Sequence, residues 1–255
     1  SYTDIHEQKQ LEERKNAFIS MASHELKTPV TSLKGFTQIL HRRLMAQADP
    51  QTLLFLDRME VQLNKLTHLI SDLLDISKME TGTLTYRKDF FDFGELVRET
   101  VENVQAATVT HQLCLQGEMH AHLYGDRDRL EQVLINLLTN AIKYSPDADT
   151  VVIHLNEDEQ GAEVAVQDFG IGIAEEYHSR IFDRFYQVTE SGRQTFPGLG
   201  IGLYIARTIV EQHGGHLWLE SRKGAGSIFR LMLPVRDQDQ ESTASLIAGV
   251  VAEEE

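Results

Sequence analysis

The sequence carries a histidine and a glutamate side by side, His24 and Glu25, within a stretch that has helical periodicity. A carboxylate next to an imidazole can accept its N–H, which fixes the tautomer and makes the other ring nitrogen a better nucleophile. Thr28 lies one turn further along the same helix face, and Pro29 removes a helix hydrogen bond, so we expect a bend just past the histidine. The pattern suits a nucleophilic histidine, although a histidine exposed on a helix is more often an ordinary surface residue.

Three polar residues in the second half of the chain could do a different kind of chemistry. Asn136, Asn140 and Lys143 fall within about 60° of one another along one edge of an expected helix. Mg²⁺ prefers hard oxygen ligands, which the two amides supply, and the lysine offsets phosphate charge. The group therefore suggests a site for Mg²⁺ and a polyphosphate, with a solvated polar edge as the alternative.

Three glycine-rich segments follow that helix. Asp168-Phe169-Gly170-Ile171-Gly172 comes after an expected strand, where the carboxylate could accept from an adenine amino group and the glycines could let the backbone approach the base. Gly198-Leu199-Gly200-Ile201-Gly202-Leu203 precedes an expected helix, whose free N–H groups would form a phosphate cradle. Gly224-Ala225-Gly226-Ser227 precedes the last expected strand. Each glycine segment taken alone could equally be a structural turn.

A long helix must carry His24. Between Phe18 and Leu44 the seam residues follow one another at steps of three or four, which predicts a helix with a coiled-coil-like seam. The expected seam consists of Ile19, Ala22, Leu26, Val30, Leu33, Thr37, Leu40 and Leu44, with Thr37 as its one polar member. His24 would lie about 160° from the centre of this seam and would therefore face water.

A second long helix is expected from Gln51 to Met79, between the break at Asp49-Pro50 and the end signal at Thr81-Gly82. Its apolar stripe consists of Leu56, Met59, Leu63, Leu66, Ile70 and Leu73. The two helices predict an all-α antiparallel hairpin. Because a hairpin alone leaves much of its apolar stripe exposed, we expect a second copy to complete a dimeric four-helix bundle.

The pattern changes after about Thr85, where short β-rich runs alternate with helical stretches and glycine-rich loops. Strands are expected at Val151–Leu155, Val164–Gln167, His216–Glu220 and Ser227–Pro234, and helices at Phe93–Ala107, Arg127–Tyr144 and Leu203–His213. This mixture predicts an α+β sandwich. We therefore expect a signalling helix or linker at 1–14, a helical domain at 15–82, a linker at 83–90, the sandwich at 91–236 and an acidic tail at 237–255.

Composition narrows the class of protein. The formal charge of −15 over 255 residues disfavours nucleic acid as a partner, because phosphate neutralisation requires clustered Lys and Arg. The single cysteine, Cys114, cannot form an intramolecular disulfide and fits a reducing cytoplasm. No run of apolar residues approaches the length of a membrane span, so we expect a soluble, cytoplasmic piece of a longer protein that is either soluble or membrane-anchored.

The segment Phe18-Ile19-Ser20-Met21-Ala22-Ser23-His24-Glu25-Leu26-Lys27-Thr28-Pro29 resembles the H box of bacterial two-component sensor histidine kinases. Leu74–Glu80 is similar to the usual end of the second helix in the same dimerisation and phosphotransfer domain. The resemblance implies that His24 is the phosphoacceptor and that Glu25 is its base. It also implies that Thr28 helps to place a water when the enzyme dephosphorylates its partner.

The order of the Asn-bearing helix and the three glycine segments resembles the N, G1, G2 and G3 boxes of the gyrase, Hsp90, histidine-kinase and MutL ATP-binding superfamily. Ile181–Tyr186 resembles the F box of histidine kinases, and residues 183–197 would be the ATP lid. By this resemblance Asn140 holds Mg²⁺ and Asp168 reads adenine. The implied nucleotide-binding residues are Asn136, Asn140, Lys143, Tyr144, Asp168, Gly170, Gly172, Arg184, Gly198, Leu199, Gly200, Ile201, Gly202 and Leu203, with Lys143 and Arg184 serving the phosphates and Tyr144 packing near the nucleotide.

The sequence departs from the family pattern in two places. Leu199 stands where small or hydroxyl residues are common, which predicts altered packing of the lid rather than lost binding. Ser227 replaces the commoner threonine, which is a mild change.

The family resemblance implies a sensor histidine kinase that uses Mg-ATP to phosphorylate His24 and passes the phosphoryl group to an aspartate of a response regulator. It also implies a homodimer, an upstream sensor domain and phosphatase activity toward the regulator. Asp168-Phe169-Gly170 also spells a motif of serine, threonine and tyrosine kinases, but the other motifs of that class are not present in the right order. An ATPase clamp of the same superfamily and an inactive dimerising scaffold are the remaining alternatives.

Overall fold

The structure is a computed structural model of the chain, and it describes residues 2–44, 49–159, 161–188 and 199–235. Side chains are described from residue 21 onward, apart from that of His24. The chain forms two compact units, Ser1–Thr85 and Tyr86–Glu255, and each is described by itself. The expected acidic tail and residues 189–197 of the expected lid lie outside the described residues. Among the described helices, none combines the length and the apolar composition that crossing a membrane requires.

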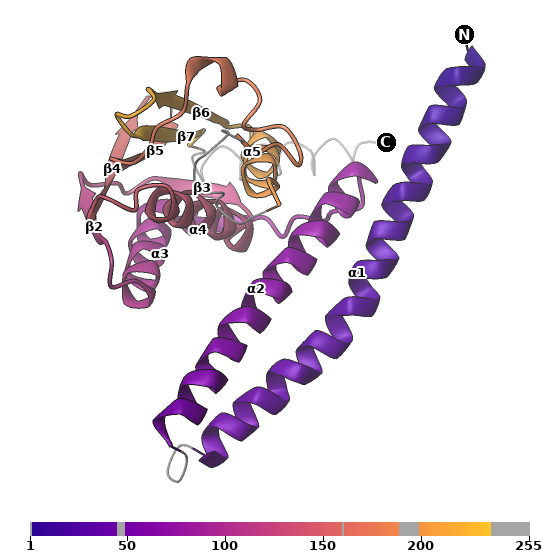
Figure 1. Ribbon diagram of the computed structural model, residues 1–255. Helices are drawn as coiled ribbons and strands as arrows, with labels where there is room; N and C mark the ends of the chain where they lie inside the picture. The colour runs from indigo at the N-terminus through magenta and orange to yellow at the C-terminus, as the bar shows by residue number, and fades with distance from the viewer. Residues whose placement is uncertain (1, 45–48, 160, 189–198, 236–255) are drawn as a thin grey trace, which may run out of the picture. The chain divides into compact units, whose positions relative to one another are not determined.

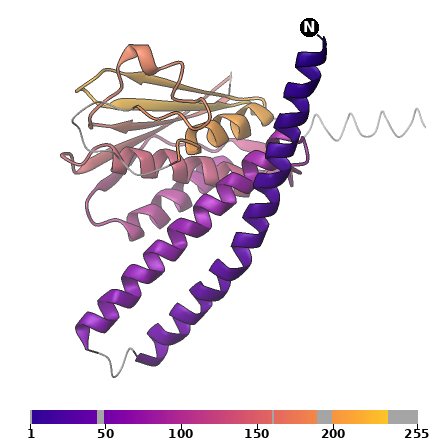
Figure 2. The same cartoon turned by 45° about the vertical axis from the view of Figure 1, so that its right-hand side comes forward.

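The first unit is an antiparallel hairpin of two helices, α1 (Tyr2–Leu44) and α2 (Pro50–Glu80), which lie side by side in Figures 1 and 2. Asp49 caps α2, because its Oδ1 atom accepts the N–H groups of Gln51 and Thr52 at 3.0 Å each. Pro50 follows at the first helical position, where it needs no N–H partner. The α1 helix continues through Pro29. The predicted hairpin is therefore confirmed.

The apolar seam of the hairpin is only partly covered. Val30, Ile70 and Leu74 form a buried cluster between the helices. Leu26 and Leu33, which belong to the expected seam, are 51% and 54% exposed. This exposure agrees with the expectation that a hairpin alone leaves much of its apolar stripe uncovered, because one neighbouring helix can cover only a narrow stripe. Among the hairpin residues whose side chains are described, the other large exposed apolar side chains are Met21, Phe36, Ile39, Leu40, Leu54, Phe55, Met59, Val61 and Leu66.

The second unit is built on a five-stranded sheet with the strand order β2-β4-β5-β7-β6. Its strands are β2 (Gln112–Gln116), β4 (Thr150–Asp158), β5 (Gly161–Asp168), β6 (His216–Ser221) and β7 (Ser227–Leu233). Only the β2–β4 pair is parallel. A separate antiparallel pair is formed by β1 (Asp89–Asp92) and β3 (His122–Gly125). The sequence predicted β4, β5, β6 and β7 but missed the other three strands.

Helices cover the sheet to give the expected sandwich (Figure 1). They are α3 (Phe93–Ala107), α4 (Arg127–Lys143) and α5 (Gly202–Gln212), and a short 3₁₀ turn, η1, spans Glu175–Tyr177. The core between helices and sheet includes the fully buried side chains of Phe93, Leu96, Leu130, Leu134, Leu137, Ile153, Ile209 and Leu231. Alternate residues of β7 are buried, as expected for a strand with one face on a core. The α+β sandwich is therefore confirmed.

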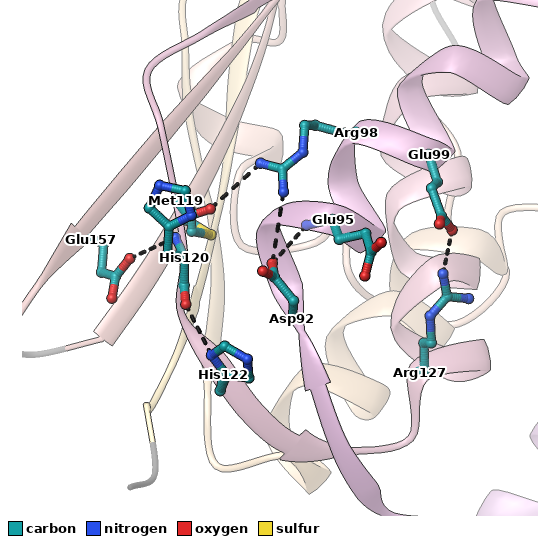
Figure 3. A network of polar contacts seen from close by, with 9 residues as sticks. All are labelled: Asp92, Glu95, Arg98, Glu99, Met119, His120, His122, Arg127 and Glu157. Carbon is teal, nitrogen blue, oxygen red and sulfur yellow. Dashed lines mark hydrogen bonds and ion pairs between the residues drawn. The ribbon is translucent and has the colours of Figure 1, made fainter.

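Polar contacts fix α3 to the loop that precedes β3 (Figure 3). Asp92 caps α3 by accepting the Glu95 N–H at 2.7 Å. Arg98 lies 3.9 Å from the same carboxylate and donates to the Met119 carbonyl at 3.5 Å. Together with the bond from the Phe93 N–H to the Ala121 carbonyl at 2.9 Å, these contacts hold the helix start against the loop.

The two histidines of the His120-Ala121-His122 segment also lie in this network (Figure 3). The His120 N–H donates to Glu157 Oε2 at 3.0 Å. The His122 Nδ1 atom lies 3.1 Å from the His120 carbonyl oxygen, so it must be the donor. Arg127 and Glu99 form a further ion pair between α4 and α3. Both histidines are exposed, and the bond from His120 to Glu157 connects the loop to β4.

Asp126 anchors the segment that leads into the sandwich. One carboxylate oxygen accepts the Arg129 N–H at 3.1 Å, and the other accepts the Arg87 N–H at 2.8 Å. The Asp126 N–H donates to His213 Nε2 at 2.9 Å, while His213 Nδ1 donates to the Ile209 carbonyl at 2.7 Å. His213 must therefore be neutral, since a protonated ring has no acceptor nitrogen. Burial is the main cause that lowers the pKa of His213.

This lowered pKa predicts that the second unit loses stability in mild acid. Above about pH 6.5 the histidine is neutral in both the folded and the unfolded chain, so the contact is fully present. As the pH falls below that value the unfolded chain binds a proton first, and each unit of pKa lowering costs up to about 1.4 kcal/mol. We expect His213→Gln to flatten the fall in unfolding free energy between about pH 7 and pH 5.

Urea unfolding followed by the fluorescence of Trp218, the only tryptophan of the chain, measures this effect in the second unit. His216→Gln, at an exposed histidine of β6, is the matched control and should keep the wild-type pH dependence. Identical slopes for wild type and His213→Gln would contradict the assignment.

Candidate active site

Two asparagines on successive turns of α4 form the first part of the candidate nucleotide site. Asn140 Nδ2 donates to Asn136 Oδ1 at 3.1 Å, and both side chains are half-buried. This bond turns the amide nitrogen of Asn140 toward Asn136 and its amide oxygen away. The structure thus brings together two of the residues that the sequence grouped, and Asn136 orients the proposed metal ligand Asn140.

Lys143 and Tyr144 stand at the end of the same helix. The Lys143 ammonium donates to the Tyr144 hydroxyl at 3.0 Å and lies 4.6 Å from the centroid of its ring. A cation held against an aromatic ring is restricted without losing its charge. Tyr144, which the sequence placed near the nucleotide, therefore also positions the lysine expected to serve the phosphates.

Asp168 lies at the end of β5 with only 4% of its surface exposed. Its Oδ1 atom accepts the Gly170 N–H at 2.9 Å, and Ser227 donates to the carboxylate through its N–H and its hydroxyl. Burial raises the pKa of this carboxyl, and the hydrogen bonds from Gly170 and Ser227 lower it. The carboxylate is thus a hydrogen-bond acceptor that is mostly buried from water, which suits recognition of an amino group.

The glycines after Asp168 allow close packing of the backbone against itself. A Cβ atom at Gly170 would lie 2.0 Å from the Tyr144 carbonyl oxygen, and one at Gly172 would lie 2.0 Å from the Arg222 carbonyl oxygen. The Ile171 N–H donates to the same Tyr144 carbonyl at 3.1 Å. The segment is therefore packed between the end of α4 and the turn after β6. The sequence had assigned these glycines to the approach of the base, and the packing gives them a second role.

The second glycine segment leads into α5. Gly198 lies outside the described residues, Leu199 is exposed and Ile201 is buried. The helix starts at Gly202, with Leu203 next, and no side chain of the described residues caps its N-terminus. Free N–H groups at a helix start are typical ligands of anions, and phosphate binding at this one stays a prediction. The expected packing of Leu199 on the lid involves residues outside the described part.

Arg184, expected to serve the phosphates, lies near this segment through its neighbour Phe185. The Phe185 N–H donates to the Gly200 carbonyl at 2.8 Å, and the Arg184 guanidinium carbon lies 5.3 Å from the Phe185 ring centroid. Arg184 is half-buried. The structure thus connects the F box to the second glycine segment.

Sequence reasoning missed His111, which supports the end of α4. Its Nε2 atom lies 2.9 Å from the Ser145 carbonyl oxygen and 3.1 Å from the Ser145 hydroxyl oxygen. Because a carbonyl only accepts, Nε2 carries the proton. His111 is buried and holds the residue after Tyr144 in place. Nothing in the local sequence signals this role, because 34 positions separate the two partners.

The candidate phosphoacceptor residues lie in the first unit. His24, Glu25 and Thr28 fall within about one turn of α1, and the side chains of Glu25 and Thr28 are exposed. The side chain of His24 lies outside the described part, so its expected exposure stays a prediction. The neighbouring acid and hydroxyl are accessible to a second protein or domain.

Two family models match the chain. The model described as "His Kinase A (phospho-acceptor) domain" matches residues 14–82. The model described as "Histidine kinase-, DNA gyrase B-, and HSP90-like ATPase" matches residues 125–237. The first match covers most of the hairpin and the second covers α4 and the glycine segments, which are the elements that hold the candidate residues.

Curated relatives resemble the chain across both units. The sensor histidine kinase WalK of Bacillus subtilis (strain 168) is 29% identical over 244 residues, covering 93% of this chain and 39% of WalK. The sensor-like histidine kinase SenX3 of Mycolicibacterium smegmatis is 32% identical over 235 residues, covering 91% of this chain and 60% of SenX3. The chain therefore spans less than two thirds of the length of either relative.

Solved structures give the same result. The Acinetobacter baumannii histidine kinase AdeS is 28% identical, with a TM-score of 0.55 over 84% of this chain and 98% of that one. Full-length ShkA, solved in complex with AMPPNP, shares the fold at a TM-score of 0.66 and 21% identity, over 86% of this chain and 46% of that one. The chain belongs to the two-component histidine kinases and forms a catalytic core of that family, a phosphoacceptor-type helical domain followed by a histidine kinase-type ATPase domain.

Proposed function

We propose that the protein to which this chain belongs is a sensor histidine kinase that uses Mg-ATP to phosphorylate His24. The phosphoryl group then passes to an aspartate of a response regulator. One observation carries the proposal: a His-Glu-Leu-Lys-Thr-Pro segment on α1 shares a chain with a sandwich in which Asn136 bonds to Asn140 and lies against Gly202 at the start of α5.

Each of the proposed site residues in the sandwich has its own part in binding the nucleotide. Asp168 accepts a hydrogen bond from the adenine amino group. The N–H groups at the start of α5 and the ammonium of Lys143 bind phosphate oxygens, with Arg184 as a further phosphate ligand. Asn140, oriented by Asn136, offers an amide oxygen to Mg²⁺, which fits the preference of that ion for oxygen ligands. When bound, Mg²⁺ offsets the charge that develops on the phosphates.

The transfer step needs a neutral imidazole. Glu25 accepts the N–H of one ring nitrogen of His24, so that the lone pair of the other nitrogen attacks the γ-phosphorus in line. The bond from that phosphorus to the bridging oxygen breaks, and ADP leaves with its electron pair. A carboxylate oxygen of the response regulator then attacks the phosphohistidine, which returns His24 to its free form.

A second copy of the chain fits the exposed face of the hairpin. Large apolar side chains such as Leu33, Phe36 and Phe55 lie on α1 and α2 with half or more of their surface exposed. Burying them against the same residues of another chain would complete a four-helix bundle. We propose the homodimer on this basis.

The proposal predicts that His24→Gln abolishes phosphate incorporation from labelled ATP, because glutamine has no nucleophilic ring nitrogen. The wild type should gain acid-labile, alkali-stable phosphate on residue 24, which peptide mapping would locate. ATP binding should be unchanged in the variant, since the nucleotide lies in the other unit.

His41→Gln is the matched control, because His41 stands on the same helix and pairs with Asp57 at 3.0 Å. We expect it to keep full incorporation. Label retained in His24→Gln would overturn the acceptor assignment. ATP hydrolysis by the wild type without any phosphohistidine would favour an ATPase clamp.

Thr28→Ala tests the proposed phosphatase activity. Thr28 is exposed one turn from His24, where its hydroxyl can hold the attacking water. We expect dephosphorylation of the response regulator to slow by about tenfold or more, since a misplaced water costs that much, while autophosphorylation stays the same.

Thr31→Ala, which removes an exposed hydroxyl bonded to the Lys27 carbonyl at 2.8 Å, serves as the control and should leave both rates unchanged. A Thr28→Ala protein with the wild-type phosphatase rate would refute this role.

Gly202→Ala tests the nucleotide site through packing. The added Cβ atom would lie 2.5 Å from Asn136 Oδ1, so the asparagine must turn and give up its bond to Asn140. The loss of one such bond is worth about 1 kcal/mol, and we expect the Kd for Mg-ATP to rise roughly fivefold to tenfold while the fold persists.

Isothermal titration with Mg-ATP measures this change. Gly35→Ala is the control, because a Cβ atom there meets nothing within 4 Å. An unchanged Kd in Gly202→Ala would show that the Asn136–Asn140 pair does not serve the nucleotide.

A further inference from the structure

One hydroxyl at the end of β6 connects two loops of the candidate nucleotide site. Ser221 Oγ accepts the Ile173 N–H at 2.8 Å and donates to the Gly226 carbonyl at 2.8 Å. It also lies 2.9 Å from Ser227 Oγ. Ile173 follows the first glycine segment, and Gly226 belongs to the third, so a single side chain holds the two loops at a fixed distance.

The strand register brings this hydroxyl next to the carboxylate that would read adenine. Asp168 pairs with Ser227 across β5 and β7, and Ser227 pairs with Ser221 across β7 and β6. The three side chains therefore form a row along one edge of the sheet. Ser221 lies at the far end of that row and does not have to touch a bound base.

The hydroxyl protons of Ser221 and Ser227 determine how Ser221 acts on Asp168. A carbonyl oxygen can only accept, so the single hydroxyl proton of Ser221 goes to Gly226. The contact between the two hydroxyls must then be donated by Ser227, whose single proton is shared between Ser221 Oγ and Asp168. An ionised carboxylate is the stronger acceptor, so this proton lies closer to Asp168, and its weaker bond to Ser221 limits the rotation of the Ser227 hydroxyl.

We propose that Ser221 is a positioning residue for purine recognition, which fixes Ser227 and the loop after Gly172 so that Asp168 presents an acceptor to the amino group of adenine. The inference rests on the proposed use of ATP and adds to it the residue that sets selectivity for the 6-amino group. Without the Ser221 hydroxyl, the Ile173 N–H and the Gly226 carbonyl lose their common partner. Ser227 is then free to turn, and the direction of the Asp168 acceptor is no longer fixed.

The test compares two nucleotides in the full chain. Mg-ATP carries the 6-amino group, and the Mg²⁺ complex of purine riboside 5′-triphosphate lacks it but keeps the same ring, ribose and phosphates. We expect the wild type to bind ATP more tightly than the analogue, and Ser221→Ala to reduce the ratio of the two Kd values by about fivefold to tenfold, the worth of one oriented hydrogen bond. The Kd for the analogue should change by less than about twofold.

Two further variants make the result specific. Ser221→Thr keeps a hydroxyl on a strand that accommodates β-branched residues, and it should preserve the ratio. Thr100→Val removes a buried hydroxyl that bonds to the Leu96 carbonyl at 2.7 Å in α3, and it should leave both affinities unchanged. Trp218 fluorescence during urea unfolding verifies that each variant is folded at the temperature of the titration.

The outcomes separate the inference from the proposed function. Binding of both nucleotides weakened by the same factor in Ser221→Ala would mean a general structural role, and wild-type affinities for both would mean no role. Either result overturns the proposal, as does a Ser221→Thr protein in which the ratio of the two Kd values falls. Failure of the wild type to bind ATP at all would instead refute the proposed function.

Discussion

Burying a carboxylate costs free energy unless hydrogen-bond donors surround it, and the second unit is arranged around one such group, Asp168. Donors reach it from Gly170, in the loop after β5, and from Ser227, the first residue of β7. The loop after β5 packs closely against other backbone segments, and only glycine allows this at positions 170 and 172. The requirement to satisfy one carboxylate therefore holds the start of this loop next to the start of β7.

The hairpin obeys a different constraint. Two helices can cover only a narrow stripe of each other, and the core of Val30, Ile70 and Leu74 is that stripe. The remaining apolar residues, among them Leu26 and Leu33, have no place in the same core. An exposed apolar face of this kind lowers its free energy when it is covered, which is the physical reason for proposing a second copy.

The sequence predicted the elements whose signal is local. Periodicity over many residues indicated both hairpin helices, and α3 was predicted with the bounds that the structure has. β1, β2 and β3 were missed because each has only four or five residues and depends on a partner strand far along the chain. The expected site residues of the sandwich, where described, were found on the predicted helix and loops, because their side-chain types and spacing are themselves the signal.

Residues that support the candidate site only through other residues could not be recognised from the local sequence. His111 and His213 look like scattered histidines, yet they bond to partners 34 and 87 positions away. Ser221 is similar, because its effect depends on the register of three strands. Periodicity likewise predicted which residues of the hairpin share a helix face, but it does not tell which neighbour covers each of them, and Leu26 and Leu33 are exposed in the single chain.

Together, the supporting residues fix both ends of α4. The start of α4 is fixed by Asp126, which bonds to Arg87 from the preceding segment and to His213 at the end of α5. Its other end is fixed through Ser145, which His111 holds, and through the Tyr144 carbonyl, which Ile171 contacts.

The helix that carries Asn136, Asn140 and Lys143 is thus attached at one end to the chain entering the unit and at the other to the loop after Asp168. A shift of α4 along its axis would have to break hydrogen bonds at both ends, each of them worth about 1 kcal/mol. The edge proposed to bind phosphate and the carboxylate proposed to recognise adenine are therefore connected through the end of a single helix.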